Sequence, residues 1–173
     1  SEEERIEKRL REIHERHKRM LDEIKKRLDD SLKTLEDLIR DVTRELEKVL
    51  KKAEDDGIDE KLLRELKKEV EEIKRRAEKL LDESRRKVEE LARRAKEINE
   101  RLKKMIEDLR RELKDGTAED LDREVKRLER EIERSIKELE ELVRKLHKEN
   151  EELIRELEEL VERLKRKIDE TSR

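Results

Sequence analysis

Few residue types in this chain could carry chemistry, and its three histidines are the first to consider. His14 and His17 are three residues apart, so on a helix they share a face and could give two ligands to a metal ion. Zinc needs three or four ligands, the chain has no cysteine, and His147 lies in a different part of the sequence. Acidic residues are everywhere, so none stands out as a further ligand. We therefore expect no metal site and no cofactor.

Catalysis is not expected either. Covalent or acid–base catalysis needs a nucleophile beside a base that a third group orients, and the sequence offers no such combination. We therefore expect that the protein is not an enzyme and that it has no catalytic or cofactor-binding residues.

The composition limits the classes of partner. Charged residues make up 61% of the chain and hydrophobic residues 30%, and Phe, Trp, Tyr, Pro and Cys are absent. The 51 basic and 54 acidic residues are interspersed and leave a net charge of −3, so we expect neither nucleic acid nor a membrane as a partner. The short apolar runs predict no signal peptide and no membrane span. We expect a soluble protein, cytoplasmic on recombinant expression.

The spacing of the apolar residues predicts the secondary structure. They recur every 18 residues, as in the column of Ile6, Ile24 and Val42. Eighteen residues at about 3.6 per turn make five whole turns, so each column stays on one side of a straight helix. A heptad begun at Ile6 fails at Arg27. The pattern therefore predicts long helices with little supercoiling, rather than the disorder that so high a charge would otherwise suggest.

Two glycines, Gly57 and Gly116, mark the turns. Glycine just past a helix end can take the left-handed conformation that closes the last helical turn. Asp59 and Thr117 follow the glycines as expected N-caps, and Ser1 has the same place at the start of the chain.

These signals predict helices near 2–55, 60–114 and 118–171, each on the order of 80 Å long. Loops this short require antiparallel neighbours. We therefore expect an all-α, single-chain, up-down-up bundle of three nearly straight helices, which forms one domain over residues 1–173.

A few polar residues interrupt the apolar stripes, and folding the chain back at the glycines brings them to two heights along the bundle. The first polar layer consists of His14, His17, Asn99 and Ser135. The second polar layer consists of Ser31, Ser84, His147 and Asn150. Each layer draws on all three predicted helices. We interpret them as buried hydrogen-bond networks that fix the register, because a polar group left alone in a core costs about 1–3 kcal/mol.

For some of these residues, interpretations that need no hydrogen-bond network are also open. Small spacers would account for Ser84 and Ser135. Partly exposed boundary residues would account for His14, Asn99 and His147. The two remaining main-stripe residues, His17 and Asn150, are hard to explain in any way other than burial.

The whole chain resembles computationally designed helical bundles with buried hydrogen-bond networks. The resemblance rests on equal helices, on loops written Asp56–Asp59 and Asp115–Thr117, on the lack of aromatic residues and on polar layers in register. Proteins of that class are very stable and have no natural activity, and some use histidine layers to respond to acid. A natural spectrin-like or coiled-coil rod is the alternative. Spectrin-like repeats usually carry a core tryptophan, absent here, and natural rods follow heptads.

We accordingly expect a highly stable scaffold that has no natural biochemical function, requires no partner and is a monomer. A pH-sensitive or partner-binding designed module is the alternative. Burial favours the neutral imidazole, so a pH-sensitive module would lose stability as the pH falls through about 6.5.

Overall fold

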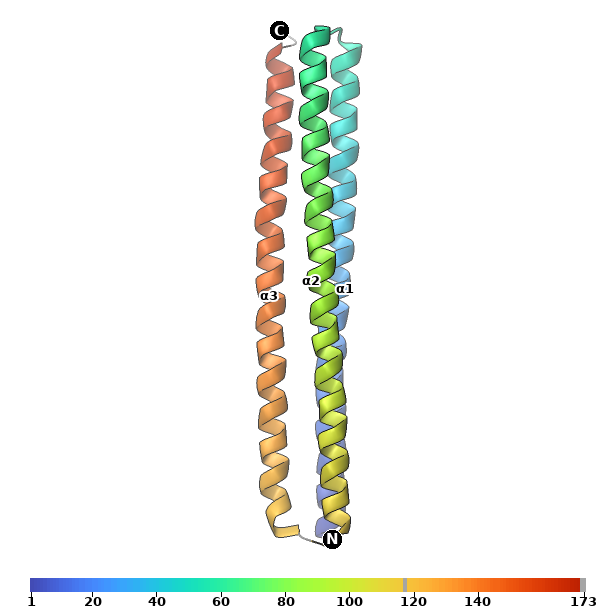
Figure 1. Ribbon diagram of the computed structural model, residues 1–173, viewed down its shortest axis with the longest axis vertical. Coiled ribbons are helices and arrows are strands. Elements are labelled where there is room, and N and C mark those ends of the chain that lie inside the picture. Colours follow the sequence, from blue (N-terminus) through green and yellow to red (C-terminus); the bar gives the residue numbers. More distant parts are fainter. Residues whose placement is uncertain (117, 172–173) are drawn as a thin grey trace. The chain divides into compact units, whose positions relative to one another are not determined.

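The computed structural model describes residues 1–116 and 118–171, without the side chains of residues 118 and 119. The described residues form three helices, α1 (Glu2–Asp55), α2 (Glu60–Lys114) and α3 (Ala118–Thr171), which Figure 1 labels. These bounds coincide with the ranges predicted from the glycines. The predicted all-α, three-helix fold is confirmed.

The start of α1 is capped as the sequence predicts. The Ser1 Oγ accepts a hydrogen bond of 3.4 Å from the backbone N–H of Glu4, and the Ser1 carbonyl accepts one of 3.2 Å from Arg5. Glu2 and Glu3 add negative charge to the first turn, where the helix dipole favours it. This end of α1 therefore has partners for N–H groups that a helix start would otherwise leave unpaired.

The turn from α1 to α2 is a Schellman motif at Gly57, whose φ is +74°. The N–H of Gly57 donates to the Glu54 carbonyl at 3.2 Å, and the N–H of Ile58 donates to the Ala53 carbonyl at 3.4 Å. Ile58 packs against the core cluster that contains Ala53, which supplies the apolar contact typical of this motif. The Asp59 carbonyl then accepts the first hydrogen bond of α2, from Leu63 at 2.9 Å.

Gly116 also has a left-handed conformation, with a φ of +92°. Before it, the N–H of Asp115 is shared between the carbonyls of Arg111 and Glu112, at 3.1 and 3.2 Å, as is common where a helix ends. The predicted cap Thr117 lies outside the described residues.

By its internal contacts the chain divides into two compact units, and each contains a section of all three helices. Unit 1 comprises Ser1–Asp29 and Val88–Lys145. Unit 2 comprises Asp30–Lys87 and Leu146–Arg173. The prediction of a single domain over 1–173 stays a prediction.

In unit 1 the three helical sections enclose an apolar core. Fully buried members of this core include Ile6, Leu10, Ile13, Leu21, Leu28, Leu102, Leu121, Leu128 and Ile132. At the surface, Arg5 pairs with Asp122 at 2.9 Å and Arg9 pairs with Glu129 at 2.7 Å, so α1 and α3 run parallel here. Such exposed pairs contribute about 0–1 kcal/mol each. The burial of the leucines and isoleucines is therefore the main source of stability.

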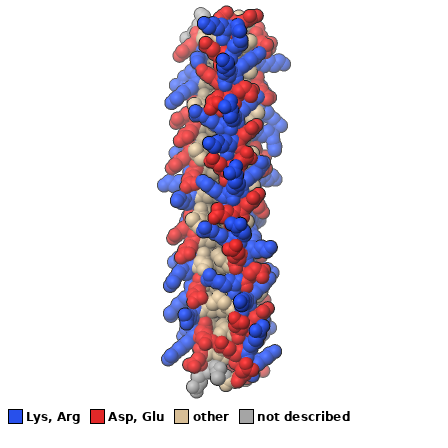
Figure 2. Space-filling view, viewed as in Figure 1, with Lys and Arg blue, Asp and Glu red and all other residues tan. Residues whose placement is uncertain are grey.

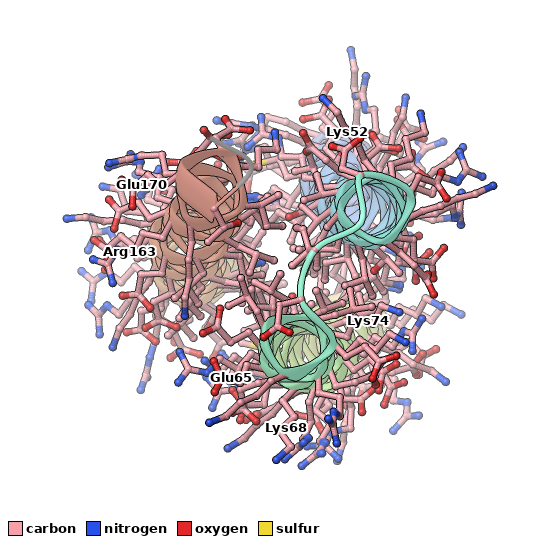
Figure 3. All side chains as sticks on the ribbon, turned by 90° about the horizontal axis from the view of Figure 1, so that it is seen from above. Lys52, Glu65, Lys68, Lys74, Arg163 and Glu170 are labelled. Carbon is pink, nitrogen blue, oxygen red and sulfur yellow. The ribbon has the colours of Figure 1, made fainter. Side chains whose placement is uncertain are left out.

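Unit 2 has an apolar core of the same kind. Its buried cluster consists of Leu35, Ile39, Leu46, Ala53, Leu66, Val70, Ile73, Ala77, Leu80, Leu157, Val161, Leu164 and Ile168. The ion pairs Glu36–Arg85 and Glu47–Lys74 join α1 to α2 in antiparallel register, at 3.2 and 3.3 Å. Figure 3 shows exposed charged residues such as Lys68 pointing away from the bundle interior.

Charged side chains of both signs are interspersed over the face shown in Figure 2, with uncharged surface between them. Within the described part of the chain, no helix has a stretch long and apolar enough to cross a membrane.

Candidate functional site

His17 is the most deeply buried residue of the first polar layer, with no exposed side-chain surface. Its Nδ1 lies 2.7 Å from the carbonyl oxygen of Ile13, one turn earlier on α1. A carbonyl oxygen can only accept, so the Nδ1–H must donate, and in the neutral ring the Nε2 is then a bare acceptor. This Nε2 is buried and has no hydrogen-bond partner among the described residues.

Two further buried polar atoms in this layer are unpaired. The Nε2 of His14 and the Oδ1 of Asn99 are both shielded from solvent without a hydrogen-bond partner, although each residue as a whole is half-buried. Together with the His17 Nε2, they are the unpaired buried side-chain atoms found within residues 1–116 and 120–171. All three lie in unit 1.

Ser135, the fourth member of the first polar layer, is half-buried, and its hydroxyl accepts a hydrogen bond from the Arg101 Nη2 at 3.1 Å. The described structure contains no hydrogen bond between any two members of the first polar layer. The network expected there does not form: Ser135 bonds to an arginine, His17 bonds to a carbonyl of its own helix, and the buried atoms of His14 and Asn99 stay unpaired. The partners Ile13 and Arg101 were not anticipated from the sequence, where nothing distinguishes them from their neighbours.

The surroundings of His14 disfavour its protonated form. Burial lowers the pKa of His14 below its ordinary value, and the positive charges of Lys18, Lys103 and Arg110 lower it further, while Glu15 acts in the opposite direction. Lys103 and Arg110 come from α2 and Lys18 comes from α1 itself. His14 is therefore neutral at neutral pH.

The second polar layer, in unit 2, is paired. The Asn150 Nδ2 donates to the Ser84 Oγ at 3.1 Å, and these two residues are only 7% and 2% exposed. The Ser31 Oγ and the His147 Nδ1 form a second hydrogen bond of 2.9 Å, between two half-buried residues of α1 and α3. All four members of the predicted layer thus make hydrogen bonds to one another, in two pairs that link α3 to both other helices.

The spacer interpretation of Ser84 conflicts with its hydrogen bond, because a pure spacer would not need a hydroxyl. Boundary positions are found for His14, Asn99, Ser135 and His147, which are half-buried. Thr43 is a polar residue of the bundle that sequence reasoning left out, and its hydroxyl donates to the Ile39 carbonyl one turn back, at 2.9 Å.

In the described part of the chain, no group of three or more His, Cys, Asp or Glu side chains is placed so that it could hold a metal ion. Comparison with known proteins gives no assignment: no family model matches the chain, and no curated protein is similar to it in sequence.

Proposed function

We propose that this chain is a de novo designed, highly stable three-helix scaffold whose role is structural. It has no catalytic activity and requires no partner to fold. The observation that carries the proposal is the second polar layer. Two hydrogen-bonded pairs, Asn150–Ser84 and Ser31–His147, occur at one level predicted from the sequence, within a core that is otherwise almost entirely apolar.

Register is the physical reason for such a layer in a scaffold. Helices covered with leucine at a regular spacing can pack at several axial offsets with similar burial, so an apolar core alone discriminates poorly between them. Moving α3 by one turn would bring Asn150 against leucine and leave its amide unpaired, at a cost of about 1–3 kcal/mol. The paired layer thus favours one alignment, which a scaffold of fixed geometry needs.

Design as the origin is supported by the joint regularity of the chain. The three helices contain 54, 55 and 54 residues, the turns close with the chain's two glycines, and no aromatic residue is present. These are the features that make the sequence resemble designed bundles.

The scaffold proposal is tested with the isolated protein by light scattering coupled to size-exclusion chromatography, and by circular dichroism in guanidinium chloride. We expect a mass of one chain, 21.3 kDa, a helical spectrum and an unfolding midpoint above about 5 M. A dimer mass, or helicity that develops only with an added partner, would contradict the proposal.

A second candidate function is an acid-sensitive module, and the first polar layer favours it. The lowered pKa of His14 means that the unfolded chain binds more protons than the folded chain just below pH 6.5. The stability contribution of this residue is therefore complete above that pH and declines as the pH falls towards the pKa of the folded state.

Unfolding midpoints at about pH 7.5 and about pH 4.5 test this second candidate. The control replaces the histidines by asparagine at His14, His17 and His147, which separates their effect from that of the many carboxylates. If the chain is an acid-sensitive module, the parent chain should lose more stability than the control when the pH falls between these two values. Equal losses in the two proteins would dismiss it.

A further inference from the structure

A groove of about 700 Å³ lies between α2 and α3 within unit 1. Its apolar residues are Ile98 of α2 and Leu139 and Leu142 of α3. Leu139 is buried, whereas Ile98 and Leu142 are only half-buried, so part of their apolar surface faces the groove and solvent. Figure 2 shows uncharged surface between α2 and α3 in its lower half, with charged side chains on both sides.

The two edges of this groove carry opposite net charge. The α2 edge bears Arg94, Glu97 and Arg101 and is net positive. The α3 edge bears Glu138, Glu141 and Lys145 and is net negative.

The charges of the α3 edge are not paired across the groove. Among the described residues, Glu138, Glu141 and Lys145 have no ion-pair or hydrogen-bond partner, and Arg101 bonds to Ser135 instead of a carboxylate. The corresponding groove in unit 2 is smaller, about 370 Å³, and there Lys167 of α3 reaches Glu69 of α2 at 2.6 Å. The unit 1 groove thus has the larger volume of the two, and the charged side chains on its α3 edge are available to a partner.

We propose that this groove binds one amphipathic α-helix of a separate polypeptide. The occupant has leucine-like side chains on the face that meets Ile98, Leu139 and Leu142. It has acidic residues along the edge that meets α2 and basic residues along the edge that meets α3. The α3 edge of the groove runs from Ser135 to Lys145 and spans about three helical turns, so the occupant needs at least that length.

A second copy of this chain is a poorer occupant than a separate helix. A helix that fills a groove must present a row of exposed apolar side chains at helical spacing. Leu153, 37% exposed, is the one exposed large hydrophobic residue among those that the structure describes. A copy therefore has no exposed apolar helix face to insert, and it could only place one groove over another.

The probe is a synthetic, fluorescein-labelled amphipathic helix of about five turns, with leucines on one face, glutamates along one flank and lysines along the other. Binding to the full chain is followed by fluorescence anisotropy. A peptide of the same composition, reordered so that no apolar face forms, is the control. We expect the amphipathic peptide to bind saturably and the reordered control peptide not to bind. Light scattering should show a complex of one peptide and one chain.

Two matched substitutions locate the site. Leu142→Lys puts a charge into the unit 1 groove, and Leu160→Lys makes the same change at a half-buried leucine of the unit 2 groove. We expect Leu142→Lys to weaken binding on the order of tenfold or more, and Leu160→Lys to change it by less than about twofold.

Charge reversal gives an independent test on exposed residues, where folding is not at risk. The variant Glu138→Lys/Glu141→Lys should weaken binding of the mixed-charge peptide and strengthen binding of a peptide with glutamates on both flanks. The proposal is overturned if the amphipathic peptide does not bind saturably, or if both leucine substitutions weaken binding equally. It is also overturned if charge reversal does not change which peptide binds better, or if the chain has a dimer mass without peptide.

Discussion

Single residues decide how much each polar layer costs the fold. An intramolecular hydrogen bond contributes about 0.5–1.5 kcal/mol, whereas a buried polar atom without a partner costs about 1–3 kcal/mol. The three unpaired buried atoms of the first polar layer therefore lower stability, while the two pairs of the second polar layer are close to neutral or favourable.

His17→Leu should raise the free energy of unfolding by about 1–3 kcal/mol, because it removes a buried unpaired nitrogen and adds apolar surface of similar size. The lost bond to the Ile13 carbonyl matters little, since that carbonyl lies inside α1 and is a natural acceptor of the helix's own hydrogen bonds. Guanidinium unfolding followed by circular dichroism measures the change. A clear loss of stability would show that the ring has a partner after all.

Ser84→Ala should lower the free energy of unfolding by about 1–3 kcal/mol, because the buried Asn150 amide loses its acceptor. The double variant Ser84→Ala/Asn150→Leu should recover most of this loss, since neither polar group then remains. The same unfolding experiment on both variants and on Asn150→Leu completes a double-mutant cycle. Strict additivity of the two single changes would contradict the pairing.

The burial of these residues follows from the sequence, but their partners do not. The 18-residue columns place His17 and Asn150 in the core, and the structure buries both. Side-chain rotamers decide which of its two ring nitrogens a histidine uses. They also decide whether a serine bonds to an asparagine or to a nearby arginine. Helical spacing contains no information about those rotamers.

At the scale of the helices and turns, Gly57 is a position where the backbone itself constrains the residue type. A Cβ added there would meet nothing within 4 Å, so only the left-handed φ of +74° opposes a side chain. Gly57→Ala should therefore cost about 1–2 kcal/mol of unfolding free energy.

Gly57→Asn is the matched comparison, because asparagine tolerates the left-handed region better than alanine does. It should cost less than Gly57→Ala in the same denaturation experiment. If the two variants lost equal stability, the cause would be something other than the backbone conformation.

Helix bounds could be predicted well because they depend on local signals. Two glycines in a chain without proline leave few places where a helix can end, and Ser1 caps α1 as expected. The groove of unit 1 could not be predicted in this way. Its volume depends on side-chain rotamers and on how closely α2 and α3 pack, and the apolar columns of the sequence specify neither.

At the scale of the whole molecule, acid should act unevenly along the chain. His14 lies in unit 1, and its lowered pKa makes protonation there unfavourable for the folded state. As the pH falls from about 7 to about 5, amide exchange corrected for its intrinsic pH dependence should accelerate first in helical segments near His14.

Hydrogen exchange with mass spectrometry measures this effect, and His14→Asn is its control. The segments of unit 2 that contain Ser31, Ser84 and Asn150 should respond less. Uniform acceleration across both units, unchanged by His14→Asn, would assign the effect to the carboxylates.

The pairing of Asn150 with Ser84 also has a consequence for how the chain folds. During refolding, α3 can dock out of register and bury nearly as much leucine, which makes such a species a kinetic trap. With the amide unpaired, the trapped species is less stable and reopens faster, so the native chain should refold in a single phase. Removing both polar groups in Ser84→Ala/Asn150→Leu should add a slow refolding phase by stopped-flow circular dichroism, even though the folded state is nearly as stable. The polar pair would then act on the route to the native state, by shortening the lifetime of the wrong alignments.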